Sequence, residues 1–190
     1  MTAPSPPQSA PAGDGGDDGI DMRRHANPLD ALAADHQRQR GLAEDLRALA
    51  DADRPDPALA RDLLARIEGE LPLHMLDEDA DLFPLLRRRA LPEDDLDGFL
   101  QRLEAEHDEI ARLEEAVVEG LQAVIAGGAL PDPSALHGFA DANSRHMKLE
   151  NAVILPLARA RLTPDDLISL RLRMGARRGI DMTREDNDAQ

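Results

Sequence analysis

The sequence predicts an all-α protein, an up-down bundle of four helices followed by a short fifth helix. Three observations predict this class. Ala, Leu, Arg, Glu and Asp dominate the 190 residues and β-branched residues are few, which is a helix-forming composition. Apolar residues recur every three or four positions along four long segments. A stretch beginning with histidine occurs twice, 72 residues apart (146 − 74), so the chain divides into two similar halves.

The boundaries of the chain's regions follow from composition. Residues 1–26 are rich in Pro, Gly, Ser, Ala and Asp without periodicity, which predicts a disordered leader. The bundle and its fifth helix should occupy residues 27–178, and the polar residues 179–190 should form a flexible tail. The first helix should run from Pro28 to Ala52, with Asn27 as its N-cap.

The other helices are bounded by the same signals, in which Asp, Thr and Pro open a helix and Gly closes one. Their expected ranges are 57–90, 91–126, 134–162 and 163–177. Pro72 and Pro84 lie inside the second helix, so we expect a kink or a break near one of them. Because the connections are short, sequential helices should be antiparallel neighbours.

Composition excludes several kinds of chemistry. The chain has no Cys, Trp or Tyr, which excludes disulfides, thiolate metal sites, iron–sulfur clusters and tyrosinate ligands. Any metal must therefore take nitrogen and oxygen ligands from His, Asp and Glu. The formal net charge of −16 argues against nucleic acid and anionic membranes as partners. No apolar run approaches the ~18 residues of a membrane span, and no signal peptide is visible, so we expect a cytoplasmic protein.

The repeated stretch carries the residues with metal chemistry. Its copies begin at His74 and His146, and both fit the frame H-M-x-x-E-x-x-x-x-x-P-L-x-R-x-R. The glutamate of each copy lies four residues after the histidine, which is one turn along the same helix face. A further pair, His36 and His107, precedes the copies by one helix each, at a spacing of 71 residues (107 − 36) and directly after an acidic residue.

Four imidazoles and two carboxylates on apolar helix faces predict a site for two first-row transition metals. The candidate ligands are His36, His74, Glu78, His107, His146 and Glu150. Symmetry assigns two histidines to each metal and makes both glutamates bridging ligands. An ordinary core does not explain the pattern, since glutamate is rarely buried unless it is paired or coordinated.

Four more polar residues need a decision. His25 and His137 do not fit the repeat, and we interpret both as surface residues. Glu114 is either a seventh ligand or a glutamate that reaches solvent at the end of the bundle. Asn143, one turn before His146, is placed to orient a ligand without binding the metal itself.

The spacing of these motifs resembles that of the hemerythrin-like HHE cation-binding domain, over about residues 28–162. The resemblance rests on His36, His74-x-x-x-Glu78 with Leu82-Phe83-Pro84, His107, and His146-x-x-x-Glu150 with Pro156. Ferritin-like di-iron bundles instead use Glu-x-x-His at i, i+3. The resemblance implies a hemerythrin-like bundle holding two iron ions in an oxo- or hydroxo-bridged di-iron centre. It also implies that dioxygen, nitric oxide or peroxide binds at an open iron position.

Two departures from the oxygen-carrying hemerythrins matter. Those proteins have a second histidine four residues after the one on the third helix, where this chain has Ala111, and their last carboxylate is an Asp five residues after its histidine, where this chain has Glu150 at four. We infer a more symmetric site with one imidazole fewer, which argues against an oxygen carrier.

Three functions stay open. The favoured one is a di-iron module that binds or senses a small oxidant and passes any signal to a protein partner through the fifth helix or the tails. The second is an enzyme that reduces peroxide or uses dioxygen or nitric oxide. The third is a structural bundle that responds to iron through folding. The lack of Tyr, Trp and Cys removes the usual electron paths and favours binding over catalysis.

Overall fold

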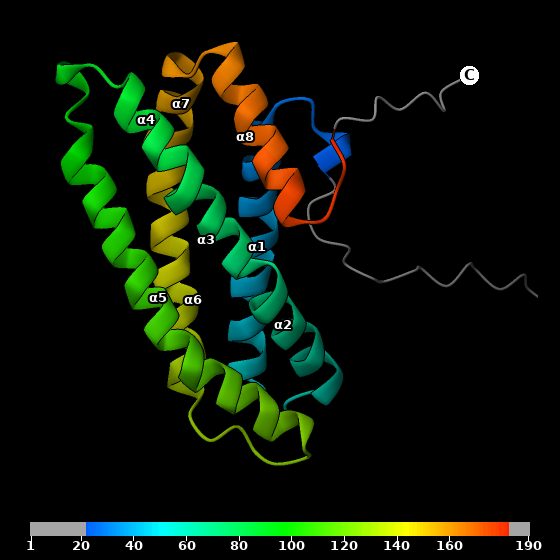
Figure 1. Ribbon diagram of the computed structural model, residues 1–190. Helices are drawn as coiled ribbons and strands as arrows, with labels where there is room; N and C mark the ends of the chain where they lie inside the picture. Colours follow the sequence, from blue (N-terminus) through cyan, green and yellow to red (C-terminus); the bar gives the residue numbers. More distant parts are fainter. Residues whose placement is uncertain (1–21, 183–190) are drawn as a thin grey trace, which may run out of the picture.

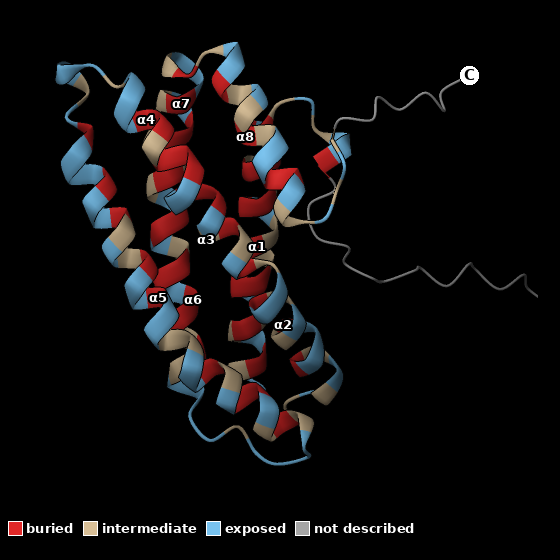
Figure 2. Cartoon of the chain, in the orientation of Figure 1, coloured by how far each residue is buried: buried red, intermediate tan, exposed pale blue. Residues whose placement is uncertain are grey.

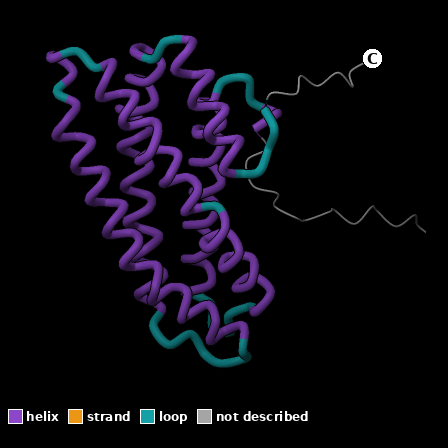
Figure 3. Tube along the Cα trace, in the orientation of Figure 1, coloured by secondary structure: helices purple, strands orange, loops and turns teal. Residues whose placement is uncertain are grey.

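The structure, a computed structural model, describes residues 22–182, and helices are the only regular secondary structure in this range (Figure 1 and Figure 3). The predicted all-α class is therefore confirmed. None of these helices has the length and apolar character needed to cross a membrane. Most of the predicted leader and tail lies outside the described residues. At the described end of the leader, however, Met22–Arg24 form a 3-10 helix (η1), and Met22 is fully buried.

The first long helix, α1, spans Pro28–Ala50 and ends two residues before the predicted position. Its predicted N-cap is confirmed, because the Asn27 side chain accepts a hydrogen bond of 2.9 Å from the backbone N–H of Leu29. Such a cap satisfies one of the N–H groups that the first turn of a helix leaves unpaired.

The predicted second helix is divided into four elements. They are α2 (Pro57–Gly69), α3 (Leu71–Asp77), the π-helix η2 (Glu78–Leu82) and α4 (Phe83–Arg89). The break at Glu70 comes just before Pro72, as expected. The π-helix comes just before Pro84, which has no N–H and whose ring would clash with the carbonyl four residues earlier. Widening the turn avoids this clash, and the N–H of Phe83 bonds to the carbonyl of Glu78 instead.

The predicted fourth helix repeats this construction. It consists of α6 (Pro133–Leu149), the π-helix η4 (Glu150–Ile154) and α7 (Leu155–Arg161). Here the N–H of Leu155 bonds to the carbonyl of Glu150, one residue before Pro156. Both π-helices therefore begin at the glutamate of the repeated motif and end before its proline.

The third and fifth helices complete the fold. A 3-10 turn, η3 (Pro92–Asp94), precedes α5 (Leu96–Ile125), so this helix begins later than predicted. The junction residue Asp95 has a φ of 44°, a left-handed conformation that Asp tolerates better than most residues and that ends the turn before α5 starts. The last helix, α8 (Pro164–Arg177), begins with the predicted Thr163 cap.

Each long helix has buried and exposed residues (Figure 2). The buried apolar residues form two clusters. In Figure 1, α1 and α5 lie beside the segment α2–α4, and α6 packs on both α1 and α5. One cluster, which we call the α8 cluster because α8 contributes to it, includes Leu32, Leu82, Phe83, Leu103 and Ile154. The other, which we call the α2 cluster because α2 contributes to it, includes Leu46, Leu63, Ile110, Leu121 and Phe139. Along every long helical segment, the polar residues of the repeated motif lie between the two clusters.

Helix α8 is attached to the segment around Glu78 by buried ion pairs. Asp77 and Asp81 are 0% and 2% exposed, and Arg177 contacts both carboxylates. Arg178 Nη2 lies 2.7 Å from Asp77 Oδ2, and Arg173 Nη1 lies 2.8 Å from Asp81 Oδ1. The two aspartates lie four residues apart on the same face, which is turned toward α8.

Arg177→Ala should destabilise the fold by about 2–4 kcal/mol, because two buried carboxylates then each lose one of their positively charged partners. The matched control is Arg87→Ala, which removes an arginine from an exposed pair with Glu104 and should cost less than about 1 kcal/mol. Urea unfolding of the two variants and the wild type measures both values. Equal losses for the two variants would show that α8 is not held by this cluster.

Candidate metal centre

The structure brings the six predicted site residues together between the two apolar clusters. Each of them is at most 5% exposed. They come from α1 (His36), α3 (His74), η2 (Glu78), α5 (His107), α6 (His146) and η4 (Glu150). Their nitrogen and oxygen atoms form two overlapping groups, and within each group one atom per residue lies within 4.8 Å of all the others. The first group is His36, His74, Glu78 and Glu150, and the second is Glu78, His107, His146 and Glu150.

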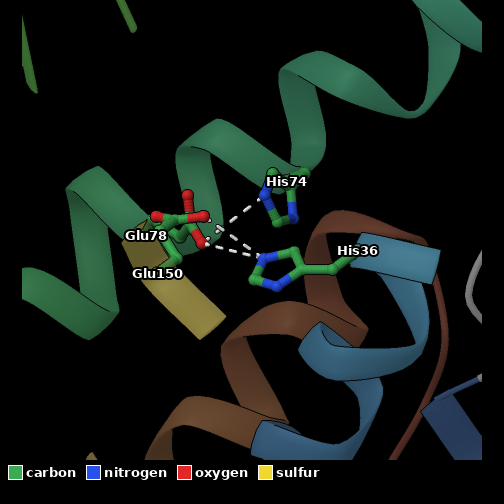
Figure 4. A group of neighbouring side chains, drawn as sticks. All are labelled: His36, His74, Glu78 and Glu150. Carbon is green, nitrogen blue, oxygen red and sulfur yellow. Dashed lines mark ion pairs between the residues drawn. The ribbon is translucent and has the colours of Figure 1, made fainter. Parts of the chain in front are cut away.

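The Glu78 carboxylate faces both histidine pairs. Its Oε1 lies 3.4 Å from His74 Nε2 and 3.7 Å from His36 Nε2, and Figure 4 shows both rings directed toward the carboxylates. Its Oε2 lies 3.4 Å from His107 Nε2 and 4.0 Å from His146 Nε2. One oxygen therefore serves each half of the repeat.

Glu150 has the same arrangement. Its Oε2 lies 3.3 Å from His36 Nε2, and its Oε1 lies 3.3 Å from His146 Nε2. Both of its oxygens are buried without a hydrogen-bond partner among the described residues, as are Glu78 Oε2 and the Nε2 atoms of His36 and His74. Buried polar atoms are normally satisfied, so this concentration of unsatisfied donors and acceptors fits a site built to hold cations.

The outer nitrogen of each imidazole contacts a polar side chain. The Nδ1 contacts are His36 with Asn151 (3.0 Å), His74 with Asp35 (2.8 Å), His107 with Asp79 (2.9 Å) and His146 with Glu106 (3.3 Å). A partner at Nδ1 fixes the tautomer and ring orientation, so that Nε2 is free to bind a metal. Phe83 stacks on the His107 ring with centroids 6.0 Å apart, which fixes that ring further.

The sequence contains a signal for all four Nδ1 partners, but from the sequence we noted only two of them, the acidic residues before His36 and His107. The acidic residues before His36 and His107 are Asp35 and Glu106, and each contacts the histidine of the next helix, not its own neighbour. Asp79 and Asn151 were missed. Each directly follows a motif glutamate, and they are separated by the same 72 residues (151 − 79) as the rest of the motif.

Other candidates lie outside the site. The prediction that Asn143 orients a ligand is not supported, because its Nδ2 is buried with no hydrogen-bond partner while Asn151 contacts His36. Glu114 is not in either group; burial and then Glu68 raise its pKa. His137 pairs with Asp51 at the surface, and His25 is half-buried near α8, its carbonyl accepting a hydrogen bond from Arg171.

Ala111 lies on α5 one turn after His107. It is exposed, while His107 and Ile110 are buried. The two groups of clustered residues contain four histidines and none from this position. That the site has one imidazole fewer than in the oxygen-carrying hemerythrins therefore stays a prediction.

Interactions between the carboxylates and the imidazoles set the pKa values of the cluster. Burial alone would lower the histidine pKa values, but Glu150 and Glu78 outweigh it and raise the pKa of His36 to about 10 and that of His146 to about 11. Against the same effect of burial, Asp79 and Glu78 raise the pKa of His107 to about 9. Burial would raise the pKa of Glu78, but the imidazoles hold it well below its usual range. A metal ion that binds here must therefore displace protons.

A family model, the hemerythrin HHE cation binding domain, matches residues 27–158. This chain belongs to the hemerythrin HHE family. None of the curated proteins matches the chain. In this hemerythrin-family chain the match includes all six clustered residues and ends before α8. Together, the family and the buried His/Glu cluster indicate a metal-binding helical protein.

In protein stripped of metal by a chelator, stability should fall between pH 7 and pH 10. The folded histidine pKa values lie above the unfolded value of about 6.5, so their stabilising interactions are complete below that pH and are lost as pH rises through 9 to 11. Few other groups titrate in this window, because the chain has one lysine and no Tyr or Cys.

Urea unfolding at a series of pH values tests this expectation. A Glu78→Gln, Glu150→Gln variant serves as the control, since it lacks the carboxylates that raise the histidine pKa values. Its stability should change much less over the same range. A wild-type stability that is constant or rises from pH 7 to pH 10 would contradict the ionic picture of the cluster.

Proposed function

We propose that this protein holds two iron ions and uses them to bind or sense a small oxidant: dioxygen, nitric oxide or peroxide. The proposal includes an up-down four-helix bundle of the hemerythrin type, with α8 as an added helix. The observation that carries it is the orientation of Glu78 and Glu150, each of which directs one oxygen to each histidine pair. Carboxylates so placed suit bridging ligands between two cations.

The donor set fits such ions. Imidazole nitrogens and carboxylate oxygens are suitable ligands for iron, and the two carboxylates offset part of the charge of two adjacent cations. We assign His36 and His74 to one ion, His107 and His146 to the other, and both glutamates to both ions. When bound, iron would supply Lewis acidity and redox chemistry toward the oxidant.

The surroundings favour a small ligand. Apolar clusters lie on both sides of the site, so bulk water and large substrates are kept away from it. Each of the six site residues is at most 5% exposed. Such burial suits a diatomic molecule or peroxide better than an organic substrate.

Glu78→Gln and Glu150→Gln should each prevent loading of two metals, because an amide is a far weaker ligand than a carboxylate. The measurement is metal per chain after anaerobic reconstitution with ferrous iron and gel filtration, where the wild type should hold two. Glu114→Gln is the matched control, since that glutamate lies outside the cluster, and it should keep two metals. Two metals per chain in both site variants would rule out the bridging assignment.

The role of the bound metal is tested by adding air, nitric oxide or peroxide to the ferrous protein. A binding or sensing module should give a visible absorption change that reverses when the ligand is removed. We expect this result because no Tyr, Trp or Cys offers an electron path to the site. Catalytic loss of peroxide, followed by oxygen or peroxide electrodes, would instead support the enzyme.

A further inference from the structure

The four partners of the imidazole Nδ1 atoms are not equivalent. Three are carboxylates and one is an amide, that of Asn151 beside His36. The His107–His146 pair therefore has two carboxylate partners, while the His36–His74 pair has one. The two halves of the site differ in these partners and not in the six candidate ligands, which are matched across the repeat.

The other partners are matched as well. Asp35 contacts His74 and is paired with Arg38, while its counterpart Glu106 contacts His146 and is paired with Arg102. Arg38 also pairs with Glu70. The charge difference at the imidazole partners therefore reduces to one position, where Asn151 stands opposite Asp79.

Asn151 is held in the orientation that makes it a neutral acceptor. Its Nδ2 donates a hydrogen bond of 2.8 Å to the carbonyl of Met147, so its Oδ1 faces His36 Nδ1 at 3.0 Å. Asp79 instead offers both carboxylate oxygens to His107 Nδ1, at 2.9 and 3.0 Å. A carboxylate partner makes an imidazole a stronger metal ligand than an amide does.

We propose that Asn151 makes the two metal positions unequal, so that the His107–His146 position binds its ion more tightly than the His36–His74 position. This inference rests on the proposed function, since it requires two metal positions. Residues that contact metal ligands from outside typically change metal affinity by about 10- to 100-fold. We expect the lower end of that range, because Asp79 is 41% exposed and water screens part of its charge.

Zinc provides the test, because it does not change oxidation state and its affinity is measured separately from any reaction with an oxidant. Titration against a chromophoric chelator should resolve two binding steps in the wild type. Asn151→Asp should tighten the weaker step by about tenfold, and Asp79→Asn should weaken the tighter step by about tenfold. Asp141→Asn, an exposed acid-to-amide change away from the site, should alter neither step.

Two precautions make the outcome decisive. Asn151→Asp loses the hydrogen bond to Met147, so if that variant fails to fold, the Asp79→Asn titration decides the question alone. His36→Gln and His107→Gln assign the steps, because the first should retain the tighter step and the second the weaker one. Two zinc ions bound with affinities that neither Asp79→Asn nor Asn151→Asp changes would overturn this inference and leave the proposed function intact. Fewer than two zinc ions in the wild type, together with fewer than two iron ions after anaerobic reconstitution, would overturn the proposed function itself.

Discussion

The fold depends on the burial of two glutamates, Glu78 and Glu150, among four imidazoles. A buried carboxylate costs several kcal/mol unless it is paired or coordinated. Burial and the neighbouring Glu78 act to raise the pKa of Glu150, but His146 and His36 outweigh them and lower it. The imidazoles compensate by carrying protons, or by sharing metal ions with the carboxylates. For the imidazoles to offset the carboxylate charges, the four helical segments must bring these side chains to the same height along the bundle. Each segment therefore carries apolar residues on both sides of its site residues.

The repeat in the sequence provides this arrangement of six side chains from two similar halves. A helix with one histidine followed by a helix with His-x-x-x-Glu gives half of a site, and a second copy supplies the other half. The contacts cross between helices, since Asp35 on α1 reaches His74 on α3, and Asp79 on η2 reaches His107 on α5. Each imidazole is thus held by a neighbouring helix, so the geometry of the site is tied to the packing of the bundle.

Much of this could be predicted from the sequence because it depends on helical periodicity. The helix caps, the apolar stripes and the meeting of six site residues all follow from spacings of three and four, combined with a repeat of 72. The role of those residues as ligands remains a prediction. The π-helices could not be predicted, since a proline indicates a distortion without specifying its form. The partners Asp79 and Asn151 were missed because in an α-helix each would lie about 100° around from its glutamate, where a surface position is the ordinary interpretation.

Helix α8 lies outside the matched family domain, yet its arginines stabilise the segment that carries Glu78. Asp77 and Glu78 are neighbours in sequence and face opposite networks, the arginines of α8 on one side and the imidazoles on the other. Asp81, one turn further on, repeats the contact with α8. The Glu78 segment therefore buries three carboxylates within five residues, and two separate networks neutralise them. Without the α8 arginines, two of these charges would be uncompensated beside Glu78, and the π-turn that orients Glu78 would lose its support.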